Sequence, residues 1–296
     1  MTSVGGRPPT WLAAESGDVM HHTRPWYACR GLSAAAVLIT IMLIALTAGP
    51  AAARVGVGVG RHRTLCAAGA YVGGRRYWVQ DDRFGADPRQ CITLTPHGRA
   101  AFTISVSRAD NPGNTAEAFP YIQYGCYWGW CTPGSALPLR VSAIRSAAST
   151  WYTREHARGI WNAGFDLWLN STRLARRHAN RAEVMIWLNA TTRHYRVRGP
   201  AGTRKVTVAG RHFFLTHWRT GTATVRGGWD YVQYRLAGAP QRVRNLNLKA
   251  ILLDAMRRHL ISRSWYLQGV LAGNEIWRGG QGLATTRFSA RVTGRR

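Results

Sequence analysis

Three short segments of the sequence place a carboxylate and a tryptophan on the same side of an expected strand. They are Asp166–Trp168 (DLW), Glu183–Trp187 (EVMIW) and Glu275–Trp277 (EIW). Side chains alternate between the two faces of a strand, so each acidic residue shares a face with the tryptophan that ends its segment. An ionised carboxylate is costly in such poorly solvated surroundings and needs a reason. Glycoside hydrolysis requires two carboxylates, one as nucleophile or base and one as acid, and aromatic rings stack on sugar faces.

The same segments also allow a structural interpretation. The sequence has 40 Lys and Arg residues against 13 Asp and Glu residues, and only Lys205 and Lys249 are lysines. The three carboxylates would then be solvated groups that pair with arginine, which contributes little to stability. Residue patterning leaves both interpretations open.

The formal net charge of +27 has two possible explanations. One interpretation is adhesion to an anionic cell wall or polysaccharide. The other is an arginine-rich composition that reflects a GC-rich genome. Nucleic-acid binding is not expected, because the arginines are spread along the chain and no nucleic-acid motif occurs. A hydrophobic fraction of 46% with 13 Trp excludes a disordered or collagen-like chain.

The N-terminal region predicts export. An apolar run over residues 32–48 follows Arg24 and Arg30 and precedes the small residues 51–53. This order is typical of a secretory signal, with cleavage after Ala53, and an uncleaved membrane anchor is the alternative. We therefore expect a leader over residues 1–53, a Gly-Val-rich linker over 54–64, and a secreted protein.

The cysteines left after that cleavage predict disulfide bonds. Cys66, Cys91, Cys126 and Cys131 remain, and an even number in an exported chain favours disulfides. Cys126 and Cys131 suit a small closed loop, and Cys66 with Cys91 would close a longer one. No Cys-x-x-Cys and no histidine pair with ligand spacing accompanies them, so no metal site is expected.

The rest of the chain reads as short strands with a single helix. Runs rich in Val, Ile, Tyr, Trp and Thr alternate with turn residues, which predicts an all-β, two-sheet sandwich. Apolar residues at helical spacing predict a packed helix over 247–261, capped by Asn245 or Asn247. No internal repeat or second domain is apparent, so one domain over residues 65–296 is expected, as a monomer. The expected strands are residues 76–80, 101–106, 164–169, 183–189, 205–208, 212–218, 231–236, 265–271 and 287–292.

Four stretches of the sequence resemble glycoside hydrolase family 12, in particular its actinobacterial endo-β-1,4-glucanases. The resemblance runs from about Leu65 to Val292, and its specific motifs are Glu-x-Met-x-Trp and a later Ala-Gly-x-Glu-x-Trp before a Gly-rich turn. The four stretches are residues 119–144, 160–170, 183–189 and 264–292.

The resemblance implies a β-jelly-roll with a concave substrate cleft and hydrolysis with retention. By motif, Glu183 corresponds to the nucleophile, Glu275 to the general acid/base, and Asp166 to an acidic residue that hydrogen-bonds the nucleophile. Met185 corresponds to a cleft methionine. The two expected disulfides also match those of the family. No metal or organic cofactor is implied.

Several positions depart from the family pattern. Asp82 and Phe84 stand where the family has Asn and Trp, Leu271 where it has Gln, and Asn274 where it has an aromatic residue. A Pro-rich segment is replaced by residues 191–202. The residues expected to contact substrate are Asp82, Phe84, Trp168, Met185, Trp187, Asn274 and Trp277.

The sequence therefore predicts a secreted, retaining endo-β-1,4-glucanase, a cellulase that acts on a β-glucan chain. One alternative is a catalytically weakened glucan- or wall-binding protein on the same scaffold. Another is a hydrolase of mixed-linkage β-glucan or xyloglucan, which the changes at Asp82, Phe84 and Asn274 would favour.

Overall fold

The computed structural model describes residues 62–84, 89–96, 99–111, 116–127, 129–173, 180–191, 202–220 and 228–295. The leader expected over residues 1–53 and most of the expected linker lie outside this described part. Within it, no helix is both long enough and apolar enough to span a membrane.

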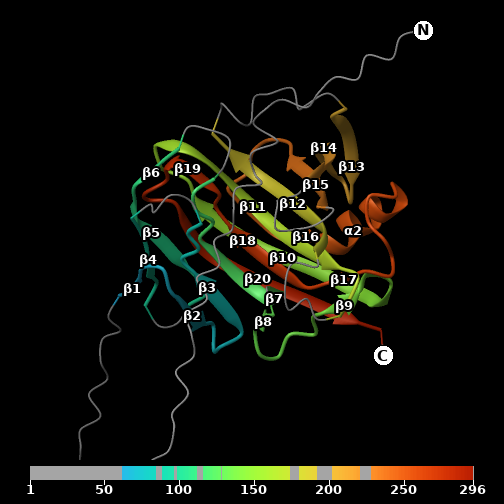
Figure 1. Ribbon diagram of the computed structural model, residues 1–296, viewed down its shortest axis with the longest axis horizontal. Helices are drawn as coiled ribbons and strands as arrows, with labels where there is room; N and C mark the ends of the chain where they lie inside the picture. Colours follow the sequence, from blue (N-terminus) through green and yellow to red (C-terminus); the bar gives the residue numbers. More distant parts are fainter. Residues whose placement is uncertain are drawn as a thin grey trace, which may run out of the picture.

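Two β-sheets form the body of the molecule (Figure 1). The smaller sheet has the order β1 (Arg63–Leu65), β4 (Gln90–Leu94), β5 (Phe102–Ser107), β20 (Ala284–Gly294), β10 (Ile144–Arg154) and β16 (Arg242–Asn247). The main path of the larger sheet is β13 (Arg204–Val208), β14 (Arg211–Thr220), β15 (Trp229–Leu236), β12 (Asn180–Ala190), β11 (Gly159–Asn170), β18 (Gly269–Gly273), β7 (Tyr121–Tyr127), β3 (Tyr77–Gln80) and β2 (Gly69–Val72). Short strands at the edges are β6 (Ala109–Asp110), β8 (Trp130–Cys131), β9 (Leu139–Arg140), β17 (Tyr266–Leu267) and β19 (Ile276–Gly279), and a 3₁₀ turn spans Val141–Ala143.

The pairing within the sheets is antiparallel, apart from the parallel pair β12–β15. Alternation along the strands separates a buried face from an outer face, as expected for strands. The side chains of Phe165 and Leu167 on β11 and of Val184 and Ile186 on β12 are fully buried between the sheets. Trp151 of β10 meets Phe165 edge to face, with ring centroids 5.1 Å apart, so both sheets share one core.

The single helix of the described residues is α2 (Leu248–Arg257), which lies at one end of the sandwich beside β13 and β16 (Figure 1). Asn247 caps it, because its side-chain oxygen accepts a hydrogen bond from the Ala250 amide at 2.9 Å. Buried Asp254 ties the helix to the larger sheet by accepting a hydrogen bond from the Tyr234 hydroxyl at 2.8 Å. The predicted helix is thus present, with Asn247 rather than Asn245 as its cap, but it ends at Arg257 instead of continuing to residue 261.

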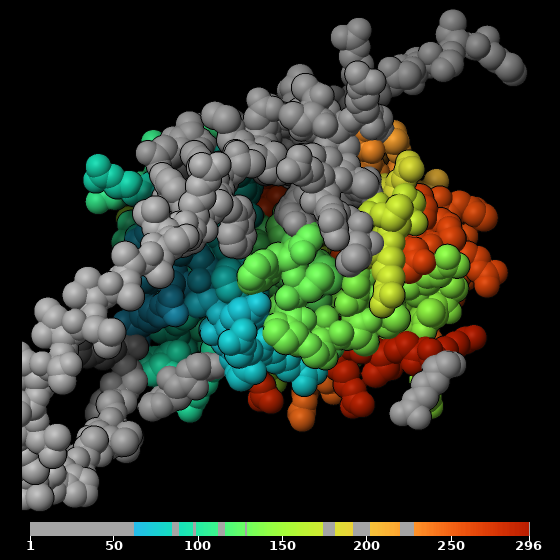
Figure 2. All heavy atoms as spheres, turned by 60° about the horizontal axis from the view of Figure 1, so that its bottom comes forward, coloured from blue at the N-terminus to red at the C-terminus, as the bar shows by residue number. Residues whose placement is uncertain are grey.

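Two disulfides join Cys66 to Cys91 and Cys126 to Cys131, as predicted. The second closes the turn between β7 and β8, and that turn reaches the edge strands β2 and β3. In the space-filling view, the sky-blue to cyan surface of β2 and β3 adjoins the green surface of the segment after β7 (Figure 2). The predicted strands are all present, and the run expected over residues 265–271 is divided between β17 and β18.

Candidate active site

Strand register brings two of the three predicted carboxylates, Asp166 and Glu183, to the side of the larger sheet that faces away from the core. Glu275, which was expected within a strand, lies just before β19 begins at Ile276. On β11, Asp166 lies opposite Met185 of β12 and opposite Leu271 of β18. Trp168, two residues along β11, lies opposite Glu183. We call this side of the larger sheet the site face. Its centre is the row of neighbouring residues Met185, Asp166 and Leu271 on three adjacent strands. Glu183 lies two residues before Met185 on β12, on the same face.

Glu183 is nearly buried, with 8% of its surface exposed. One carboxylate oxygen accepts a hydrogen bond from the indole Nε1 of Trp229 at 2.8 Å. An indole can only donate, so this contact favours the ionised carboxylate. The Trp229 ring also packs against Trp168, with ring centroids 5.7 Å apart. Glu183 is therefore held as an acceptor within an aromatic wall.

Glu275 lies in the connection between β18 and β19 and is held by one residue of β11. The Asn162 amide donates to the Glu275 carbonyl at 3.0 Å, and the Asn162 side-chain oxygen accepts from the Glu275 amide at 3.1 Å. The Asn162 side-chain nitrogen donates to the Glu275 carboxylate. The Asn162 carbonyl in turn accepts from the side chain of Asn274 at 3.0 Å. Asn162 thus fixes both the backbone and the carboxylate of Glu275.

The surroundings of Glu275 and Asp166 disfavour their charged forms. Burial raises the pKa of Glu275 to about 7, although the hydrogen bond from Asn162 opposes the shift. Burial and then the charge of Glu275 raise the pKa of Asp166 well above its ordinary value, against a hydrogen bond from the Trp168 indole at 2.6 Å. The two carboxyls repel each other, so near neutral pH they retain a proton between them.

Asp166 has unused hydrogen-bonding capacity. One of its oxygens accepts from the Trp168 indole. The other, Oδ1, is buried and has no hydrogen-bond partner among the described residues. A protonated Asp166 would therefore be a donor at the centre of the site face.

Met185 and Trp187 form the floor beside Glu183. The Met185 sulfur accepts from the Tyr231 hydroxyl at 2.8 Å and from the Trp187 indole at 3.5 Å. Tyr231 is stacked on Trp218, with centroids 4.2 Å apart. Met185 is 1% exposed and Trp187 3%, so most of both side chains is used in packing.

The other predicted contact residues differ in their exposure. Asp82 is half-buried, and burial, followed by the charge of Asp81, raises its pKa to about 7. Phe84 is also half-buried and packs against the cluster that contains Trp168. Asn274 is 1% exposed and Trp277 2%, so these two residues present little surface to a ligand.

The sequence did not identify Asn162 or Trp229, whose side chains donate hydrogen bonds to the carboxylates of Glu275 and Glu183. Alternation along β11 puts Asn162 on the same side as Gly164 and Asp166, which was the available signal. For Trp229 there was none, because its contact with Glu183 depends on the parallel pairing of β15 with β12.

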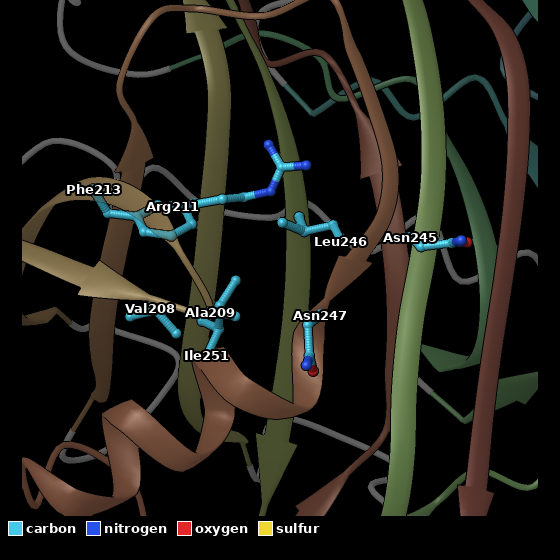
Figure 3. A pocket seen from close by; sticks show the side chains of 8 residues that line it. All are labelled: Val208, Ala209, Arg211, Phe213, Asn245, Leu246, Asn247 and Ile251. Atoms are coloured by element: carbon cyan, nitrogen blue, oxygen red, sulfur yellow. The ribbon is translucent and has the colours of Figure 1, made fainter.

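A pocket of about 200 Å³ lies elsewhere, where the β13–β14 hairpin meets the start of α2 (Figure 3). None of the predicted site residues lines it. Its lining is Val208, Ala209, Arg211, Phe213, Asn245, Leu246, Asn247 and Ile251. Among the described residues, no group of three or more His, Cys, Asp or Glu side chains is placed to hold a metal ion.

Comparison with known proteins supports one family. A family model described as "Glycosyl hydrolase family 12" matches residues 75–293. The chain is 31% identical over 159 residues to "Probable cellulase Cel12b" of Mycobacterium tuberculosis, which covers 54% of this chain and 99% of that protein. Among solved structures, a metagenome-derived glycoside hydrolase family 12 endoglucanase superposes with a TM-score of 0.71 at 34% identity, covering 80% of this chain and all of the other. Endoglucanase cel12A from Rhodothermus marinus gives a TM-score of 0.71 at 33% identity, covering 79% of this chain and 100% of the other.

The hydrogen bonds between Asn162 and Glu275 predict how the Glu275 carboxyl titrates. With only five glutamates in the sequence, carbon-13 labelling of glutamate carboxyls allows each pKa to be followed by NMR. Glu275 should titrate near 7, and Asn162→Ala should raise its pKa further, because the donor that favours the charged form is lost.

Asn189→Ala is the matched control, because Asn189 donates to a different buried glutamate, Glu155. That variant should alter Glu155 and leave Glu275 unchanged. A Glu275 carboxyl that titrates at an ordinary value of about 4.3 in the parent protein would contradict this account of the site.

Proposed function

Because this chain belongs to glycosyl hydrolase family 12 and is therefore a glycosidase, we propose that it is a secreted, retaining endo-β-1,4-glucanase. The observation that carries the proposal is the contrast between two glutamates on one sheet face. Glu183 accepts a hydrogen bond from an indole, whereas burial raises the pKa of Glu275 to about 7. Environments that separate two carboxyls in this way assign one as nucleophile and one as acid.

In the proposed first step, a Glu183 oxygen attacks the anomeric carbon as the Glu275 carboxyl gives its proton to the glycosidic oxygen. The bond from the anomeric carbon to that oxygen breaks, and the leaving chain departs with a new hydroxyl. In the second step, Glu275 takes a proton from water, and the water oxygen displaces Glu183 from the anomeric carbon. Both glutamates return to their starting states.

Asp166 would assist Glu183 in both steps. The raised pKa of this carboxyl means that it keeps a proton, which it would donate to a Glu183 oxygen. Such a bond would place Glu183 for attack and would spread its charge as the covalent bond breaks in the second step. This agrees with the role that the family resemblance implies for Asp166.

Export is supported by the apolar leader and by the two disulfides, which persist in oxidising compartments. The mature chain is proposed to begin near Arg54. The choice of a β-1,4-glucan as substrate is supported by the names of the more similar proteins, which are a probable cellulase and an endoglucanase. Less similar structures, at 22% identity, are named as xyloglucanases.

The activity is tested by reducing-sugar release from soluble cellulose, mixed-linkage β-glucan and xyloglucan. The parent should release sugar, with a basic limb near pH 7 because Glu275 must be protonated. Glu275→Gln should lower the rate by about 100- to 10,000-fold, since it removes the general acid. Glu183→Gln should abolish it.

Asp110→Asn is the control, because Asp110 is an exposed carboxylate paired with Arg278 at the molecular edge. It should retain parent activity. Absence of release from all three substrates by the folded, disulfide-bonded parent would contradict the proposal and would favour a glucan-binding protein. Preference for xyloglucan or mixed-linkage glucan would keep the mechanism and change the substrate.

The distribution of charge supports an association with an anionic wall as a second candidate function. The strands β10, β16 and β20 of the smaller sheet contain no acidic residue. Their exposed arginines are Arg145, Arg154, Arg242, Arg244, Arg287 and Arg291. Arg242 and Arg287 flank the Tyr152 ring, at 5.8 and 5.6 Å from its centroid. This cationic face lies on the opposite sheet from the candidate catalytic carboxylates.

The association can be measured with inactive Glu183→Gln protein on cellulose fibres with and without oxidation to carboxylates. Binding should favour the carboxylated fibres and fall with added salt. Changing Arg242, Arg287 and Arg291 to Gln should weaken it, whereas the same change at Arg204, Lys205 and Arg211, which removes equal charge from the β13–β14 hairpin, should not. Equal losses in both triple variants would indicate a nonspecific charge effect.

A further inference from the structure

The aromatic surface of the site face continues well beyond the candidate catalytic residues. Starting at Trp168, neighbouring ring centroids are 6.1 Å apart to Tyr127, 5.6 Å from there to Tyr121, and 5.7 Å on to Phe119. Trp78 of β3 packs against the same cluster. The site face therefore carries a connected series of rings from the middle of the larger sheet to its edge.

Three rings from different strands meet at that edge. Trp78 of β3 lies 5.0 Å from Tyr71 of β2 and 5.3 Å from Trp130 of β8, centroid to centroid. Tyr71 and Trp130 are 6.3 Å apart. We call Tyr71, Trp78 and Trp130 the edge cluster. Trp130 is 50% exposed, and no other large hydrophobic residue in the described part of the chain is exposed.

The exposed position of Trp130 is fixed by its connections. The disulfide Cys126–Cys131 closes the turn beside it. The side-chain nitrogen of Gln123, a residue 1% exposed on the site face, donates to the Trp130 carbonyl at 3.0 Å and to the Gly125 carbonyl at 2.9 Å. The Trp130 indole is half exposed, but the cross-linked turn restricts the conformations of its backbone before any ligand binds. This lowers the conformational entropy that is lost on binding.

The position of the Trp78 ring depends on a glycine in the neighbouring strand. A Cβ atom at Gly69 would lie 2.3 Å from Cζ2 of Trp78, far inside contact distance. The indole therefore covers the backbone of Gly69, and its Nε1 donates to the side chain of Gln80 at 3.0 Å. Any side chain at position 69 would displace the ring.

We propose that the edge cluster is a sugar-binding platform that holds a β-glucan chain at a distance from the bond that is cleaved. The inference rests on the proposed function. Pyranose rings have flat apolar faces that stack on aromatic side chains. The three rings offer contact area to a neutral glucan, and the Arg75 guanidinium, 4.8 Å from the centroid of the Tyr71 ring, adds hydrogen-bond donors beside them.

The position of the cluster defines the occupant further. Strand β3 is three strands from β11, which corresponds to about 14 Å at the usual strand spacing of about 4.8 Å. One sugar cannot bridge Asp166 and Trp78, whereas an oligosaccharide that crosses the strands passes over both. The platform should therefore act on long substrates and leave short ones unaffected.

The test measures binding of cellohexaose and cellobiose to Glu183→Gln protein by calorimetry, without and with Trp130→Ala. Loss of the indole should weaken hexaose binding about 5- to 30-fold, the range of a contact worth one or two kcal/mol. Cellobiose binding, which needs only the central site, should not change. Trp130→Phe should restore part of the loss, and Gly69→Ala should mimic Trp130→Ala by displacing Trp78.

Trp265→Ala is the matched control, because Trp265 is a partly buried aromatic residue that packs against the main core and belongs neither to the ring series nor to the cationic face. This variant should bind both sugars like the parent. Unchanged hexaose binding in Trp130→Ala, or equal losses for both sugars, would overturn the platform. So would self-association of the parent in sedimentation that Trp130→Ala abolishes, because the cluster would then be a contact between copies.

The same proteins separate this proposal from the proposed function. If the parent is active but its binding of hexaose does not depend on Trp130, only the platform proposal is contradicted. If the parent is inactive but binds hexaose in a way that depends on Trp130, the proposed hydrolase activity is contradicted and the platform proposal stands.

Discussion

The repulsion between carboxyl groups on one poorly solvated sheet face is the constraint on which the site depends. Asp166 and Glu275 are close enough that the charge of Glu275 raises the pKa of Asp166, and burial disfavours ionisation of both. They cannot both lose their protons near neutral pH without a large electrostatic cost. A proton is therefore available beside Glu183, whose own contact with the Trp229 indole favours charge. The division of roles between nucleophile and acid follows from that asymmetry.

The hydrophobic core keeps this arrangement in place. The strand that presents Asp166 and Trp168 to the site face buries Phe165 and Leu167 between the sheets. A slip of one residue in its pairing would move the carboxylate into the core and the phenyl ring to the site face. Core packing thus fixes the register, and the register fixes which carboxyls meet. The favourable burial on one side of β11 offsets the cost of the poorly solvated acids on the other.

The sequence predicted the strands and the three carboxylates because alternation and turn residues are local signals. It did not predict Asn162 and Trp229 as partners of Glu275 and Glu183, because each contact joins residues that are distant along the chain. Parity along a strand indicates which face a side chain occupies but not how deeply it is buried. Of the residues expected to contact substrate, four are exposed by 3% or less: Met185, Trp187, Asn274 and Trp277. Local sequence signals likewise do not show how deeply Glu275 is buried, and burial is the main cause of its raised pKa.

The most direct test of the two-glutamate account is to trap the glycosyl-enzyme and locate it by mass spectrometry. A cellobioside with fluorine at carbon 2 of the reacting sugar and a good leaving group at its anomeric carbon would be used. The fluorine destabilises the oxocarbenium-like transition states, and the leaving group keeps the first step fast, so the ester accumulates. The account predicts one added disaccharide on the peptide that contains Glu183, and none in Glu183→Gln. An adduct on another residue, or turnover of β-glucan with no adduct and with inverted product, would contradict it.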